Sequence, residues 1–239
     1  MRPILAFNWK MNPQTEEEAA RLAAASDETG VIVFPPFPLI HVVRNQLTKA
    51  MLGAQDVSAA DGGAHTGEVS PEMLKALNVS SVIVGHSERR KLGEDDALVA
   101  SKALQAARQG ISPLLCVGES EAERSDGLEV EVVTRQLKTV FDLLGREGLG
   151  SRLMVAYEPI WAIGTGENDA PEDANRVAEI ILKVAEGFNL FPRVLYGGSV
   201  TSATAGRYIG KHSTLSGFLV GGASLKPEEV RNMITEFLL

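Results

Sequence analysis

Residues 194–224 read VLYGGSVTSATAGRYIGKHSTLSGFLVGGAS, and this stretch contains two short apolar runs that each end in a pair of glycines. The first run leads into Gly197 and Gly198, and the second leads into Gly221 and Gly222. Both runs are continuously apolar rather than alternating, which is typical of strands covered on both faces, as in a parallel sheet. The stretch therefore predicts two consecutive strands of a parallel sheet.

Six further runs of the same kind precede this stretch. The eight candidate strands are 4–7, 31–34, 51–54, 81–84, 112–116, 154–157, 194–196 and 218–220. Segments with apolar residues near a 3.6-residue spacing predict helices at 16–25, 95–109, 129–144, 173–188 and 227–237. Pro227 suits the first turn of a helix, whereas Gly110 and Gly187 stand where helices commonly end.

The strand and helix segments alternate along the whole chain with no proline-rich or serine-rich linker between them. This order favours one (β/α)8 barrel domain over residues 1–239 rather than a doubly wound open sheet. The first strand also ends in Asn8-Trp9-Lys10 instead of the glycine-rich turn that binds a dinucleotide. In a barrel, the carboxyl ends of the strands form the active face, so the residues that follow each strand become candidates for function.

Composition predicts a cytoplasmic protein that acts on small molecules. The 23 basic and 31 acidic residues give a net charge of -8, which argues against binding to nucleic acid or an anionic membrane. The single cysteine, Cys116, ends an apolar run and reads as a buried small hydrophobe in a reducing compartment. The first residues show no secretory signal, and no apolar stretch reaches the length of a membrane span. His65 lacks metal-ligand spacing with any other histidine. We expect neither a metal nor a cofactor.

The sixth strand is followed by Glu158 and then by an apolar segment, Pro159 to Gly166, that reads as a flap. Proline fixes one φ angle, the glycines allow a hinge, and Ile160 and Trp161 would be unusual residues to leave permanently in water. Closure of this flap over a ligand would remove water from Glu158 and strengthen the carboxylate as a base towards a carbon acid. The alternative is an apolar loop that is merely packed on the surface.

Two other strand ends carry polar side chains suited to the same chemistry. Asn8 and Lys10 are two residues apart after the first strand, so their side chains leave the chain on one side. His86 follows the fourth strand, where a barrel places its chemistry. Taken singly, Lys10 could be a solvated lysine and His86 a structural histidine, and we expect Glu88 to pair with Arg89 or Arg90.

The two glycine pairs and the long third loop complete the pattern. Glycine pairs after strands seven and eight match the common phosphate site of barrels, where backbone N–H groups bind the anion. The segment 55–68 after the third strand has neither helical nor strand periodicity, and loops of this length usually have a function. It could contact a partner subunit or be a flexible surface excursion.

The ordered motifs resemble the triosephosphate isomerase family from nearly one end of the chain to the other. They are NWKMN at 8–12, GHSERR at 85–90, CVGE at 116–119, AYEPIWAIGTG at 156–166, YGGS at 196–199 and GGASL at 221–225. The resemblance implies a TIM barrel that interconverts dihydroxyacetone phosphate and glyceraldehyde 3-phosphate. It makes Glu158 the proton acceptor, His86 a neutral electrophile and Lys10 a fixed positive charge.

The same resemblance assigns substrate binding and assembly. Asn8 would position the substrate, and the phosphate would be held by Gly164, Ser199, Gly221 and Gly222. The family is usually a homodimer, in which Thr66 at the tip of the third loop would reach the neighbouring subunit near Asn8 and Lys10.

Three positions depart from the family pattern. His65 replaces the usual aromatic residue beside Thr66, which puts the tightness of the dimer in doubt. Glu167 stands where many members have lysine, and the segment after Arg90 is one residue short, so a supporting role for Glu94 is uncertain.

Two rival interpretations stay open from the sequence. One is another phosphate-binding barrel, such as a sugar-phosphate epimerase or a Schiff-base aldolase, although an aldolase commonly needs a lysine where Glu158 stands. The other is a phosphometabolite-binding protein without catalysis, although binding alone does not call for Asn8, Lys10, His86 and Glu158 together.

Overall fold

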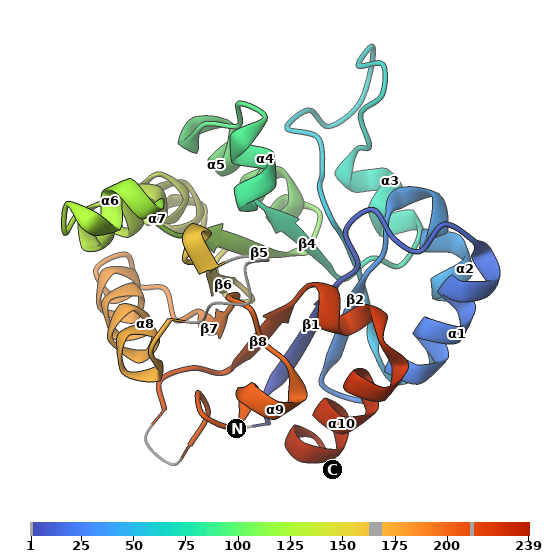
Figure 1. The fold of residues 1–239 in the computed structure, drawn as a ribbon. Helices are drawn as coiled ribbons and strands as arrows, with labels where there is room; N and C mark the ends of the chain where they lie inside the picture. Colours follow the sequence, from blue (N-terminus) through green and yellow to red (C-terminus); the bar gives the residue numbers. More distant parts are fainter. Residues whose placement is uncertain (1, 163–168, 211–212) are drawn as a thin grey trace.

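The eight apolar runs form a closed barrel in the computed structural model, which describes residues 2–162, 169–210 and 213–239 (Figure 1). The strands are β1 Ile4–Asn8, β2 Val31–Phe34, β3 Met51–Ala54, β4 Ser81–Val84, β5 Ser112–Val117, β6 Met154–Tyr157, β7 Arg193–Tyr196 and β8 Gly217–Val220. Each strand pairs in parallel with the next along the chain, and β8 closes the barrel on β1 with Ile4 opposite Gly217. The (β/α)8 prediction and all eight predicted strands are confirmed.

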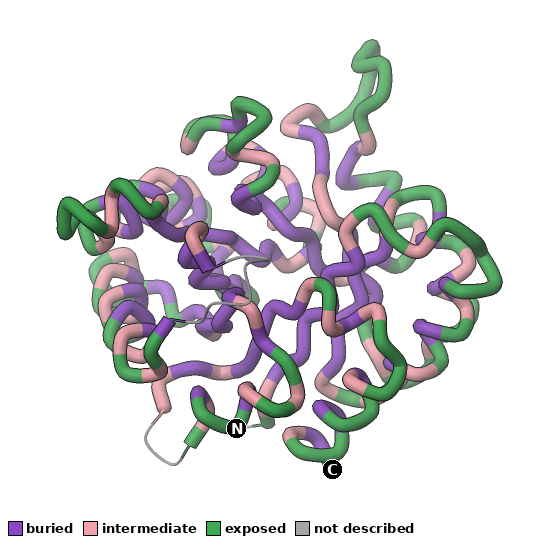
Figure 2. Tube along the Cα trace, viewed as in Figure 1, coloured by how far each residue is buried: buried purple, intermediate pink, exposed green. Residues whose placement is uncertain are grey.

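The strands are buried on both faces, which explains why they read as continuous apolar runs (Figure 2). Alternate side chains point into the barrel, where Ala6, Leu114, Leu195 and Leu219 belong to one interior cluster. The intervening side chains, such as Leu115, belong to a larger cluster that includes the apolar faces of the surrounding helices. The barrel is therefore held by two apolar layers that meet at the strands.

The long helices begin and end close to the predicted residues. They are α1 Glu16–Ser26, α5 Asp96–Arg108, α7 Glu129–Glu147, α8 Pro171–Glu186 and α10 Pro227–Phe237. Their local chemistry agrees with these limits: the side chain of Asp95 accepts the N–H of Leu98 at the start of α5, and Pro227 is the first residue of α10. Gly148 caps α7 with a φ of 68°, a conformation that favours glycine.

Several short helices had no counterpart among the predictions. They are α2 Ile40–Arg44, α3 Pro71–Ala76, α4 Ser87–Lys91, α6 Glu121–Ser125 and α9 Ser202–Ala205, with 3₁₀ turns η1 Phe37–Leu39, η2 Ile160–Ala162 and η3 Gly222–Leu225. A helix of one turn is too short to show a 3.6-residue period, so its apolar pattern does not distinguish it from a loop.

The predicted long loop between β3 and α3 extends away from the barrel (Figure 1). Residues 61–68 at its tip are all exposed (Figure 2). In the part of the chain that the structure describes, no helix has the length and apolar character needed to cross a bilayer.

Candidate active site

A cavity of about 460 Å³ lies at the carboxyl ends of the strands and brings the predicted residues together. Seven of them line it: Asn8, Lys10, His86, Glu158, Ser199, Gly221 and Gly222. These residues end or follow β1, β4, β6, β7 and β8, and they meet because in a closed parallel barrel all strands end on the same face. The eighth predicted residue, Gly164, lies at one of positions 163–168, which include the end of the predicted flap and are outside the described residues.

Glu158 emerges from β6 with its side chain almost completely buried, at a residue exposure of 3 %. Its backbone N–H donates to the carbonyl of Val117 over 2.8 Å, which fixes the position of the residue against β5. One carboxylate oxygen lies 3.2 Å from Nε2 of His86, and the other accepts the backbone N–H of Ser87 over 3.3 Å. Burial opposes ionisation, but His86 and this N–H outweigh it and hold the pKa of Glu158 below its ordinary range.

His86 stands at the N-cap of α4, and both of its ring nitrogens have partners. Nδ1 accepts the backbone N–H of Glu88 over 3.2 Å, so Nδ1 carries no proton and Nε2 carries the proton that faces Glu158. Burial disfavours the imidazolium, whereas attraction to Glu158 overcomes this penalty and raises the pKa of His86. The neutral Nε2–H form beside an ionised Glu158 is the arrangement that gives both nitrogens a suitable partner.

Lys10 is held in an unusual backbone conformation next to this pair. Its φ is 53°, in the left-handed region that non-glycine residues seldom occupy, and its backbone N–H donates to Oδ1 of Asn8 over 3.0 Å. The side-chain amide of Gln55 donates to the carbonyl of Lys10 over 2.8 Å. Strained backbone held by hydrogen bonds is characteristic of functional sites.

The expectation that Glu88 pairs with Arg89 or Arg90 is wrong. Glu88 lies 2.6 Å from Nζ of Lys10, because α4 turns this side chain towards the mouth of the barrel. The two arginines have other partners: Arg89 contacts Asp56 and Glu94, and Arg90 contacts Asp96.

Glu94, whose role was uncertain from the sequence, is buried in a cluster of charges. It accepts from Lys102 over 2.6 Å and from Arg89 over 2.7 Å. Lys102 also contacts Asp56, so the cluster ties the residues after β3 to those after β4.

The glycine pairs give the cavity its space. A Cβ on Gly222 would meet no atom of the described residues within 4 Å, so the space beside its Cα is open. A Cβ on Gly197 would lie 2.8 Å from Cγ of Glu158, so the first pair makes room for the carboxylate. The hydroxyl of Ser199 donates to the carbonyl of Ala162 over 2.8 Å and links this end of the cavity to the beginning of the flap.

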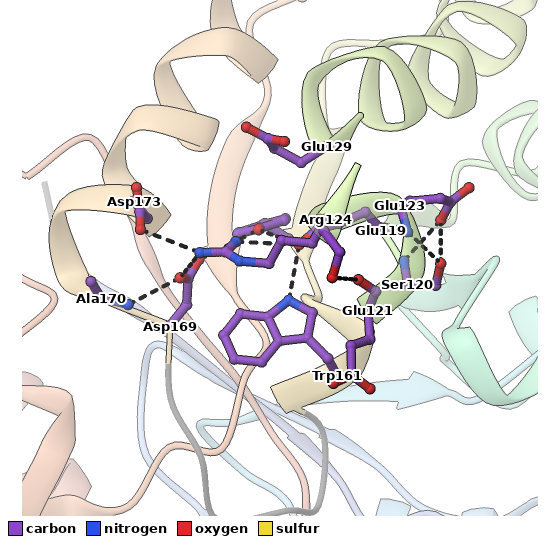
Figure 3. Close-up of polar contacts among 12 residues, drawn as sticks. Glu119, Ser120, Glu121, Glu123, Arg124, Glu129, Trp161, Asp169, Ala170 and Asp173 are labelled. Atoms are coloured by element: carbon purple, nitrogen blue, oxygen red, sulfur yellow. Dashed lines mark hydrogen bonds and ion pairs between the residues drawn. The ribbon is translucent and has the colours of Figure 1, made fainter. Parts of the chain in front are cut away.

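A polar cluster that sequence reasoning missed joins the residues on either side of positions 163–168 (Figure 3). The indole N–H of Trp161 and the hydroxyl of Tyr157 both donate to Oε1 of Glu119, each over 3.1 Å. Arg124 lies over the Trp161 ring at 4.6 Å and donates to Asp169 over 2.8 Å. Burial raises the pKa of Asp169 despite this ion pair.

The cavity also contains polar residues that the sequence did not indicate, namely Thr201, Lys226 and Glu229. Thr201 is the N-cap residue of α9, and Lys226 and Glu229 lie at the start of α10, which contacts α9. No local motif identifies them. Among the described residues, no three His, Cys, Asp or Glu side chains gather as metal ligands.

These groups are suited to one kind of reaction. An ionised, buried carboxylate can remove a proton from carbon, and an N–H donor beside it can polarise the adjacent carbonyl. Lys10 supplies positive charge for a developing oxyanion, and the glycine-bordered end leaves room for an anionic group of the ligand.

Comparison with known proteins agrees with this chemistry. Residues 3–237 match the family model described as triosephosphate isomerase. The chain is 44% identical over 242 residues to the triosephosphate isomerase of Thiobacillus denitrificans, an alignment that covers 95% of each chain. It is 40% identical over 249 residues to that of Hahella chejuensis, covering 98% of this chain and 97% of the relative. It is 38% identical over 250 residues to that of Aquifex aeolicus, covering 99% and 100%.

Proposed function

The chain belongs to the triosephosphate isomerase family, and from this premise we propose that the 460 Å³ cavity is its active site, with Glu158 as the base. The enzyme interconverts dihydroxyacetone phosphate and D-glyceraldehyde 3-phosphate in glycolysis and gluconeogenesis, by proton transfer through an enediol(ate). The observation that carries the assignment is the buried contact of 3.2 Å between Glu158 and His86.

Glu158 and His86 divide the proton transfers between them. The carboxylate of Glu158 takes the proton from the carbon beside the carbonyl, and the Nε2–H of His86 donates to the carbonyl oxygen. Lys10 stabilises the negative charge that develops on that oxygen, and Asn8 helps to position the substrate. The proton then returns from Glu158 to the neighbouring carbon, while the hydroxyl proton moves between the two oxygens. The direct contact between Glu158 and His86 must open to admit the reacting atoms.

The phosphate group would lie at the opposite end of the cavity. The backbone N–H groups of Gly221 and Gly222 and the hydroxyl of Ser199 are its proposed donors, together with Gly164. The Ser199 hydroxyl now donates to Ala162, so phosphate binding would exchange this bond and release the start of the flap. Closure of the flap would then remove water from Glu158.

We propose further that the chain is one domain and a cytoplasmic homodimer. The exposed tip at 61–68 is the proposed contact, with Thr66 reaching the partner near Asn8 and Lys10. An exposed, protruding loop gains stability when a second subunit covers it, and light scattering coupled to size exclusion would measure the assembly.

A coupled assay that follows conversion of glyceraldehyde 3-phosphate tests the assignment of the base. Glu158→Gln keeps the size of the side chain and removes the base, so kcat should fall by about 10²-fold to 10⁴-fold. Glu16→Gln, on the exposed face of α1, is the matched control and should retain full activity. A Glu158→Gln enzyme as active as the wild type would refute the assignment.

The two rival chemistries are tested separately. Borohydride with substrate would leave a covalent adduct on Lys10 if the enzyme worked as a Schiff-base aldolase, and we expect none. A phosphometabolite-binding protein without catalysis would bind the triose phosphate and show no turnover in the coupled assay.

A further inference from the structure

A second cavity, of about 240 Å³, lies at the amino-terminal end of the barrel, opposite the active site. It is lined by the first residues of several strands, which include Met51, Ser81, Ser112 and Arg193. None of these residues takes part in the isomerase chemistry, because all strands point their carboxyl ends to the other face.

Arg193 belongs to the lowest layer of the barrel interior. It lies two residues before Leu195, a member of the interior cluster, so the alternation of the strand directs both side chains inwards. By the same alternation Ser81 and Ser112 point inwards below Ile83 and Leu114. This part of the interior therefore has a guanidinium and two hydroxyls, whereas the inward side chains directly above them, Leu195, Ile83 and Leu114, are apolar.

The guanidinium of Arg193 is only partly satisfied. Nη2 donates to the carbonyls of Arg2 and Ser216, over 2.5 and 3.1 Å. Nε is buried without a hydrogen-bond partner, and Arg193 makes no ion pair within the described ranges. Burial lowers the pKa of Arg193, as expected for a charge that has lost water without gaining a counterion.

The rest of the cavity suits an anion with an apolar portion. Arg152 provides a second cation, and no Asp or Glu among the described residues lines the cavity. Ser81 donates its hydroxyl to the backbone carbonyl of Ser112 over 2.8 Å, and within the described part of the chain the Ser112 hydroxyl makes no hydrogen bond of its own. Two large apolar side chains stand exposed at the rim, Phe191 at 76 % and Met51 at 43 %.

We propose that this cavity is a second ligand site, for a small organic anion whose oxoanion head binds Arg193 and whose apolar body packs on Phe191 and Met51. The head supplies the counterion that the Arg193 guanidinium lacks, and a charge-assisted hydrogen bond to this group is stronger than one between neutral groups. Because the ligand binds only the folded barrel, its binding also raises the free energy of unfolding.

Phenyl phosphate is a suitable probe, with inorganic phosphate as the parallel arm without an apolar body. Crystals of the wild-type enzyme grown with phenyl phosphate should show the ligand at Arg193 in addition to any ligand in the 460 Å³ cavity. Calorimetric titration of the wild type should resolve two classes of site, and inorganic phosphate should bind the Arg193 class more weakly because it lacks the contact with Phe191. Equal affinity of the two probes would refute the role of the apolar rim.

Arg193→Gln separates this site from the active site. The variant should weaken binding at one class by about tenfold or more and leave kcat/KM within about twofold of the wild type. Arg207→Gln, at an exposed position after α9, is the matched control and should retain both classes. The proposal is refuted if ligand density appears only in the 460 Å³ cavity, or if Arg193→Gln binds phenyl phosphate at both classes of site as the wild type does. Arg193 would then serve only to donate hydrogen bonds to the carbonyls of Arg2 and Ser216. Should the variant fail to fold, the wild-type crystal decides.

Discussion

Replacing Gly197 with alanine should damage catalysis by displacing Glu158. The added Cβ would lie 2.8 Å from Cγ of Glu158 and 3.3 Å from the carbonyl of Tyr157. Gly197 cannot retreat easily, because its N–H donates to that same carbonyl over 2.8 Å. Carbon atoms in contact prefer about 3.5–4.0 Å, so the Glu158 side chain must move by roughly 1 Å.

A movement of this size has a predictable effect on the rate. Displacing a reacting group by about 1 Å can lower the rate by about 10²-fold, and we expect this loss mainly in kcat. The overlap should also lower the free energy of unfolding by about 1–3 kcal/mol, because the carboxylate is buried and its neighbours must shift. The φ of Gly197 is not in the left-handed region, so the effect comes from the clash and not from the backbone.

The test measures kcat and KM in the coupled assay and the free energy of unfolding in urea. Gly210→Ala is the matched control, because its Cβ would meet no atom of the described residues within 4 Å and the residue is exposed. If Gly197→Ala folds and its kcat stays within about threefold of the wild type, the position of Glu158 does not control the rate as argued.

Two further predictions concern stability. Asp27 accepts the backbone N–H groups of residues 48–50 and the hydroxyl of Thr48, and these bonds outweigh burial and lower its pKa to about 2. Since this pKa is depressed on folding, the wild type should be more stable than Asp27→Asn by about 1–2 kcal/mol above about pH 4. This advantage should disappear as the pH falls towards about 2, and urea unfolding across that range would reveal a pH-independent difference if the idea is wrong. Arg124→Met leaves buried Asp169 unpaired and should cost about 2–3 kcal/mol, whereas an unchanged melting temperature would contradict a structural role for the ion pair.

Much of the barrel and of the site followed from short-range patterns. A strand covered on both faces must be apolar along its length, so eight such runs identified the strands before any contact was known. A closed parallel barrel then brings every strand end to one face, so Lys10, His86 and Glu158 were expected together although they are far apart in the chain.

Other features depend on which side chains meet across the fold. Glu88 had two neighbouring arginines to pair with, yet it contacts Lys10, which is 78 residues away. Likewise, Glu119 and Arg124 have no local pattern that connects them to Trp161 and Asp169. Such pairings are decided by where each helix directs its side chains, and a linear sequence does not contain these directions.

The sequence by itself determined the number of strands, their burial and the chemistry at their carboxyl ends, because periodicity and strand-end residues are local properties. Only the tertiary structure decided the contact of 3.2 Å between Glu158 and His86, the cluster that joins Trp161 to Asp169 and the lack of a partner for Nε of Arg193 within the described residues. The physical reason is that distance and burial arise when the barrel closes, and these two quantities set the pKa of Glu158 and leave the charge of Arg193 without a counterion.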